Sequence, residues 1–205
     1  MIERHRLEPF FPKNAETLIL GSFPPPVSRW SMEFFYPNLQ NDFWRIFGIV
    51  FFNDLNYFLD SRTDGRDGTS VRRFNQAAIA AFLRRKKFAV YDAALEVIRT
   101  KGNASDDRLH VVKALDLTET LSRLAGVRRI VFTGQKAAET LWPQIAPGES
   151  LRKIPKPGSA VHQTVAGRMV WVARVCSPSR AYPLAIEKKA EIYRKIFERK
   201  QYPEP

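Results

Sequence analysis

Four short apolar segments, rich in β-branched and aromatic residues, recur along the chain at residues 17–21, 87–92, 129–134 and 169–175. Continuous apolar runs of this length are typical of strands buried on both faces, as in a parallel sheet. We therefore predict four buried strands. The Pro/Gly/Ser-rich stretch at residues 154–164 is expected to be a loop that leads into the last of them.

Longer stretches with apolar residues at helical spacing lie between and after these segments. They cover residues 70–85, 116–125, 135–142 and 183–200. Strands that alternate with helices predict a three-layer α/β/α domain, with a central, mostly parallel four-stranded sheet between layers of helices. No internal repeat, low-complexity linker or shift in composition marks a boundary, so we predict one domain over residues 1–205.

The chain is strongly basic, and the positive charge is concentrated in its second half. It has 33 Lys and Arg against 21 Asp and Glu, and the second half contributes +9 of the net charge of +12. Residues 150–180 hold six basic side chains and no acidic one, and these include Arg152, Lys153 and Lys156. Such a run can be a solvated face, but here it flanks the expected mouth of the sheet, where ligands bind. We therefore expect contacts with nucleic-acid phosphates.

The composition excludes several cofactor-dependent classes of protein. Cys176 is the single cysteine, which excludes a disulfide framework, a cysteine-held iron–sulfur cluster and a multi-cysteine zinc site. His5, His110 and His162 are scattered along the chain and do not suggest a metal site. A P-loop and a GxGxxG motif are both missing, which argues against ATP-driven and dinucleotide redox chemistry. We expect no metal and no cofactor.

The hydropathy pattern gives no sign of a membrane protein. No apolar run of 18 residues occurs, and the first residues lack the apolar core of a signal peptide. We therefore expect a cytoplasmic or nucleoid-associated protein without a membrane partner, and a monomer.

The loops after the predicted strands carry the candidate chemistry, because ligands of open parallel sheets bind at the carboxyl ends of strands. Gly21 ends the first strand and allows the backbone to approach a ligand closely. The prolines at 24–26 lack N–H donors, so this loop is not a phosphate cradle. Residues 34–44 combine aromatic rings with amides, which suit base stacking and the binding of a base edge or a water. Phe43 and Trp44 are expected to begin a helix and fill the core.

A short polar turn follows the fourth predicted strand and contains Ser177, Pro178, Ser179 and Arg180. Its hydroxyls, backbone amides and guanidinium can hold a phosphodiester, although an ordinary strand-to-helix connection would use the same residue types. Cys176 precedes the turn and is expected to be a structural thiol, since the sequence places no histidine beside it.

Four of these segments resemble the uracil-DNA glycosylase superfamily: LILGSFPP at 18–25, FFYPNLQNDFW at 34–44, VFTGQKA at 131–137 and CSPS at 176–179. The nearest branches are the mismatch-specific and hypoxanthine-DNA glycosylases, in which an aromatic residue precedes an asparagine by five positions, as Tyr36 precedes Asn41. Asp92 and the polar residues 103–107 also fall where the family has an Asp-bearing strand end and a polar turn. The resemblance covers about residues 17–182.

This resemblance implies a monofunctional DNA glycosylase that hydrolyses the N-glycosidic bond of a deaminated base, uracil or hypoxanthine, in base excision repair. Such an enzyme must rotate the damaged nucleotide out of the duplex. Asn41 would position the attacking water and Tyr36 would stack on the base. The first motif would surround the base with Gly21, Ser22, Phe23 and Pro24, and its backbone N–H groups near Ser22 would stabilise the leaving base. The flanking phosphates would be held by Ser177, Pro178, Ser179, Arg180, Arg152, Lys153 and Lys156.

The chain departs from the family pattern at three places. Phe23 stands where several branches carry Asn, Asp or Glu, and residues 38–40 replace the usual His-Pro before the asparagine. Ser177 and Ser179 both align with the serine of the last motif. These differences leave open which base is removed and whether the protein is active. The alternatives are a catalytically inactive nucleic-acid-binding protein of the same fold and a small-molecule nucleoside hydrolase, which would not need the basic second half.

Overall fold

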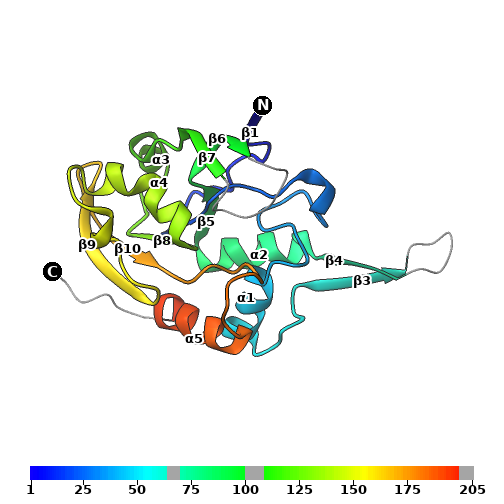
Figure 1. The fold of residues 1–205 in the computed structure, drawn as a ribbon. Helices are drawn as coiled ribbons and strands as arrows, with labels where there is room; N and C mark the ends of the chain where they lie inside the picture. The colour runs from blue at the N-terminus through cyan, green and yellow to red at the C-terminus, as the bar shows by residue number, and fades with distance from the viewer. Residues whose placement is uncertain (64–69, 100–108, 199–205) are drawn as a thin grey trace.

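A five-stranded, mostly parallel sheet forms the centre of the computed structural model, which describes residues 1–63, 70–99 and 109–198 (Figure 1). Its strands, in spatial order, are β5 (Phe88–Asp92), β2 (Thr17–Gly21), β8 (Arg129–Phe132), β10 (Arg168–Arg174) and β9 (Ser159–Val165). The first four are parallel, and β9 pairs with β10 in the antiparallel direction. The predicted α/β class and the four predicted strands are confirmed, and β9 is the fifth strand.

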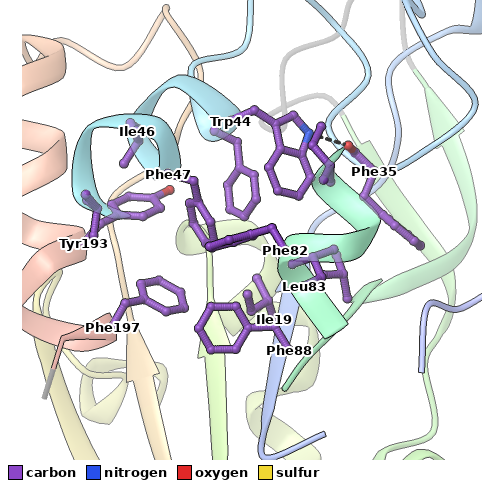
Figure 2. Packing of buried hydrophobic residues seen from close by; sticks show 14 of the residues in the cluster. Ile19, Phe35, Trp44, Ile46, Phe47, Phe82, Leu83, Phe88, Tyr193 and Phe197 are labelled. Carbon is purple, nitrogen blue, oxygen red and sulfur yellow. Dashed lines mark hydrogen bonds between the residues drawn. The ribbon is translucent and has the colours of Figure 1, made fainter. Parts of the chain in front are cut away.

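Helices cover both faces of this sheet. One face carries α1 (Phe43–Phe52), α2 (Gln76–Lys86) and α5 (Ile186–Phe197), and the other carries α3 (Leu117–Arg123) and α4 (Gln135–Ile145). Figure 2 shows the first layer, where Phe47, Phe82 and Phe88 pack together. Phe43 and Trp44 are fully buried at the start of α1, as predicted, and the Trp44 indole N–H donates to the Phe35 carbonyl at 2.9 Å.

Two further antiparallel sheets were not predicted. Strands β1 (Ile2–Arg4), β6 (Ala94–Arg99) and β7 (Leu109–Ala114) form one of them, and β3 (Leu59–Thr63) and β4 (Ser70–Phe74) form a hairpin. The hairpin projects from the body of the molecule in Figure 1. The sheet that contains β1 matters for the site, because it brings the first residues of the chain to the end of β5.

Three predicted boundaries are wrong. Helix α2 begins only at Gln76, because the Asn75 side chain accepts from the Ala78 N–H and caps it, and the preceding residues form β4. Helix α4 continues through Pro143 to Ile145, since a proline in the last turn removes only one helical hydrogen bond.

The third wrong boundary is the predicted loop at residues 154–164, which contains most of β9. Ala166 and Gly167, both with positive φ, form the tight turn that pairs β9 with β10. The polar residues 103–107 lie outside the described residues. Among the helices that the structure describes, none is both long and apolar enough to cross a bilayer.

Candidate functional site

A cavity of about 1030 Å³ opens at the carboxyl ends of the parallel strands. Its wall contains the predicted site residues Ser22, Phe23, Pro24, Tyr36, Asn41, Ser177, Pro178, Ser179 and Arg180. Gly21 packs closely against Tyr36 and against Asp92, a further residue of this wall. The strand order explains the convergence, because β2, β5, β8 and β10 all end at this edge.

Asn41 lies at the start of α1 and is held from two sides. Its side-chain oxygen accepts from the N–H of Phe43, the first residue of α1, at 2.9 Å. Its backbone forms an isolated antiparallel bridge with Ser179. The amide group therefore has a fixed position on the cavity wall. The hydrogen bond to the Phe43 N–H also fixes the direction in which the amide nitrogen can donate and the second lone pair of the oxygen can accept.

Tyr36 lines the cavity with a half-buried ring. One face of the ring stacks on Phe43, with centroids 3.7 Å apart and planes 12° apart. The hydroxyl shares a 2.7 Å hydrogen bond with the Thr133 hydroxyl. The backbone of Tyr36 has a φ of 51°, which is uncommon for an aromatic residue and is found at functional turns. A base could therefore stack only on the ring face opposite Phe43.

The turn at residues 177–180, called the serine turn below, is attached to the start of α1 by an ion-pair network. The Asp42–Lys189 pair at the centre of this network is buried. Asp42 accepts from Arg180 Nε at 3.0 Å and from Lys189 Nζ at 3.1 Å. Lys189 is 1% exposed and also donates to the Ser179 carbonyl at 2.7 Å. The Asp42 N–H donates to the Pro178 carbonyl. The structure thus brings together two motifs that are more than 130 residues apart in the sequence.

Both serines of the turn face the cavity, so the structure leaves the choice between them open. The Ser177 hydroxyl accepts from the Ser179 N–H, and the Ser179 hydroxyl accepts from the Ala181 N–H. Both hydroxyl groups act as acceptors in these bonds, so the proton of each can be donated to a ligand. Cys176 is buried, and burial raises the pKa of its thiol to about 11, so the expected structural thiol agrees with the geometry.

The basic segment lies beside the cavity rather than in its wall. Arg152, Lys153 and Lys156 are all exposed, and the neighbouring Pro157 lines the cavity. Arg174 holds this segment in place, because its Nε donates to the Pro155 carbonyl. Burial lowers the pKa of the Arg174 guanidinium, and the nearby Tyr182 and Glu139 raise it. Lys156 is therefore adjacent in sequence to a residue of the cavity wall, and Arg152 and Lys153 precede it in the same segment.

Several wall residues escaped the sequence prediction. Gln135, Lys136 and Glu139 come from the first turns of α4, and Arg174 comes from the end of β10. The sequence feature that could have pointed to these wall residues is the predicted strand-to-helix junction at residues 133–135. Among the described side chains, no three His, Cys, Asp or Glu residues gather closely enough to hold a metal ion.

Gly21 is a strict packing requirement of the site. A Cβ at this position would lie 2.2 Å from Asp92 Oδ1 and 2.9 Å from the Tyr36 hydroxyl oxygen. Both side chains are anchored, Asp92 by His5 and Tyr36 by Thr133, so neither can move away freely. The close approach explains why the first motif has glycine here.

We predict that Gly21→Ala lowers the free energy of unfolding by about 1–3 kcal/mol, because the added methyl overpacks the site. It should also slow any reaction in the cavity. Thermal melting measures the first effect. Gly21→Ala combined with Asp92→Ala should lose less stability than the sum of the two single variants, since the closest atom to the added methyl is then gone. A single variant that melts like the wild type would show that the site relaxes around the methyl.

The fold is shared with a solved structure. A solution NMR structure of a protein from Methanosarcina acetivorans, described as a "putative Uracil DNA glycosylase", is similar with a TM-score of 0.58 and 21% sequence identity. The similarity covers 97% of this chain and 99% of that chain. No protein-family model and no curated protein matches the sequence. The two proteins share a mixed α/β fold in which helices flank a mostly parallel central sheet.

Proposed function

We propose that this protein is a DNA glycosylase that releases a deaminated base, uracil or hypoxanthine, by hydrolysing its N-glycosidic bond in base excision repair. The observation that carries the proposal is the convergence of Tyr36, Asn41 and the serine turn on one cavity. The description of the Methanosarcina protein, which shares the fold, supports the same reaction.

The flipped base would enter the cavity and stack on the ring face of Tyr36 opposite Phe43. Asn41 would position the attacking water with its fixed amide. An amide is too weak a base to deprotonate water strongly, so this mechanism depends on bond cleavage that runs ahead of attack, with positive charge on the sugar. Backbone N–H groups near Ser22 and Phe23 would stabilise negative charge on the leaving base.

The serine turn would hold the phosphates beside the flipped nucleotide. Arg180 is about half exposed and uses only Nε for Asp42, so its remaining guanidinium donors are available to a phosphate. The hydroxyls of Ser177 and Ser179 lie on the same wall. Such contacts would position the anomeric carbon next to the attacking water without a covalent bond between the protein and the DNA.

Incubation with oligonucleotides that contain uracil, hypoxanthine or xanthine, single- and double-stranded, tests the proposal. Base release should produce strand cleavage only after treatment with alkali. Lys136 lines the cavity, so cleavage without alkali would indicate a lysine-dependent lyase and contradict monofunctional chemistry. Borohydride trapping of a covalent adduct would identify that outcome directly.

A second candidate is a nucleic-acid-binding protein of this fold without catalytic activity. It is favoured by Phe23, whose ring contacts the His5 ring edge-on and the Arg99 guanidinium where a polar side chain would serve catalysis. Tight binding to abasic-site DNA without release of any of the three bases would select this candidate over the glycosylase.

We predict that DNA binding depends strongly on salt and that neutralising Arg152, Lys153 and Lys156 together lowers this dependence. Each lost phosphate contact should reduce the slope of log K against log salt by about 0.9 on duplex DNA. Fluorescence anisotropy over a salt series measures the slope. The matched control replaces three other exposed cations, Arg84, Arg85 and Lys86, and changes the net charge equally. If both triple variants lower the slope of log K against log salt equally, the DNA does not bind along residues 152–156.

A further inference from the structure

The β3–β4 hairpin projects from the body of the molecule, but its base is built into the core (Figure 1). Phe58, directly before β3, and Phe74, at the end of β4, are each 1% exposed. Phe58 packs on Trp44 of α1 with ring centroids 5.8 Å apart. The Asn75 N–H donates to the Phe58 carbonyl at 2.8 Å and joins the two ends of the hairpin. The hairpin therefore leaves the molecule at a fixed place beside α1.

The two faces of β4 differ in what surrounds their arginines. Arg45, in the first turn of α1, extends over the Phe74 ring, with its guanidinium carbon 5.5 Å from the ring centroid. Arg72 precedes Phe74 by two residues, so its side chain lies on the same face of the strand. Arg73 lies on the opposite face, where its Nε is 3.9 Å from Asp60 Oδ2 on β3. Only the face that carries Arg72 is therefore turned toward α1.

Three guanidinium groups gather on this face, those of Arg180, Arg45 and Arg72. Burial lowers the pKa of the Arg45 guanidinium, the charges of Arg180 and Arg72 lower it further, and Asp42 raises it. Asp42 already accepts hydrogen bonds from Arg180 and from Lys189. Like charges held together repel each other, and a surface of one sign raises the local concentration of counter-ions. The cluster is therefore suited to a partner with several negative charges.

We propose that the face of the β3–β4 hairpin that carries Arg72 binds a phosphate of duplex DNA outside the damaged nucleotide, a proposal that rests on the proposed glycosylase function. Arg180 lies in the cavity wall, whereas Arg45 and Arg72 lie outside it and continue the positive charge onto the hairpin. Phosphates of one DNA strand follow each other at about 3.4 Å along the helix axis, so a duplex that passes Arg180 presents further phosphates to this surface. Such contacts orient a duplex without reading its sequence.

The variant Arg72→Gln tests the contact. Fluorescence anisotropy over a salt series, on a duplex with a stable abasic-site analogue, should show that the slope of log K against log salt falls by about 0.9, the value for one phosphate contact. The matched control is Arg73→Gln, which makes the same change of charge on the opposite face of the same strand and should leave the slope unchanged. The single-turnover rate of base release at saturating protein should stay within about twofold in Arg72→Gln, because Arg72 does not line the cavity.

Two further measurements separate a phosphate contact from a change in folding. Arg72→Lys keeps the positive charge and should keep the wild-type slope, and Arg72→Gln removes a repelling charge, so its midpoint of thermal unfolding should not fall. The duplex is then shortened by one base pair at a time on each side of the abasic site. The difference in affinity between the wild type and Arg72→Gln should disappear once one flank no longer reaches the hairpin, and shortening the other flank should not remove it.

Two outcomes would overturn the proposal while base release is intact. One is a slope in Arg72→Gln equal to that of the wild type. The other is an equal loss of slope in Arg72→Gln and Arg73→Gln, which would mean that the contact does not belong to the face beside α1. A wild-type protein that releases no base from any lesion, but shows the expected difference between the two variants, would instead overturn the glycosylase proposal and leave the hairpin as a DNA-binding surface.

Discussion

Asn41→Ala should lower the rate of base release by about 10²–10⁴-fold, the range expected when a group that orients or activates water is removed. Asn41 lies on the cavity wall, and its position is fixed by the Phe43 N–H and by the backbone bridge to Ser179. Alanine keeps the backbone contacts and removes only the amide. Single-turnover kinetics on a uracil or hypoxanthine oligonucleotide measures the rate, and affinity for abasic-site DNA should be retained.

The structure gives Asn41 a second role that the experiment must separate from catalysis. Its side-chain oxygen accepts from the first N–H of α1, and loss of an acceptor at a helix N-terminus costs about 0.5–2 kcal/mol of stability. Asn41→Asp keeps an oxygen acceptor for the Phe43 N–H and is a stronger base than the amide, so it should preserve both the melting temperature and base release. An alanine variant that is less stable but reacts at the wild-type rate would assign Asn41 to the helix N-terminus alone.

The fold was predictable because its central strands are buried on both faces. Segments such as residues 17–21 and 129–134 are continuous apolar runs, and burial on both faces produces this pattern. The edge strand β9 is mostly only partly buried, pairs with β10 alone among the described strands, and carries His162, Gln163 and Thr164. Its sequence therefore resembles a loop, and the hairpin was not predicted; the turn at Ala166–Gly167 is the feature that pairs β9 with β10.

The site was predictable where its residues lie in the loops that follow the predicted strands, and this includes the turn at residues 177–180. Tyr36 and Asn41 lie in one loop, and both reach the cavity. Asp92 and His5 are 87 residues apart, and their contact depends on the pairing of β1 with β6, two short strands with weak patterns. Lys189 lies on the buried face of α5, three residues after Ile186 and four before Tyr193, but its partner Asp42 is 147 residues away and no local pattern indicates that pairing. Contacts between residues so far apart in the sequence depend on the tertiary structure, so local sequence patterns do not predict them.

Lys189 and Asp42 form the buried connection between the start of α1 and the serine turn in the cavity wall. Lys189 donates both to Asp42 and to the Ser179 carbonyl, so one ammonium group holds the start of α1 and the serine turn together. Both side chains are almost inaccessible to water, at 1% and 9% exposure. Removing one partner of such a pair leaves a buried charge without full compensation.

We predict that Lys189→Met lowers the free energy of unfolding by about 3 kcal/mol, the lower end of the range for a broken buried pair, because Arg180 still faces Asp42. For a chain of this size the midpoint of thermal unfolding should fall by roughly 6–12 °C. The control is Lys188→Met, which changes the neighbouring exposed lysine and should alter stability by less than about 0.5 kcal/mol. Equal melting of the two variants would contradict a stabilising role for the pair.

The double variant Lys189→Met with Asp42→Leu distinguishes stability from positioning. Replacing both charges with apolar groups removes the unpaired charge, so much of the lost stability should return. The contact to the Ser179 carbonyl and the ion pair to Arg180 are not restored, and the turn that faces Asn41 loses two of its anchors. Base release should therefore remain slow in the stable double variant. Recovery of both stability and rate would show that the network supports the fold and does not position the serine turn.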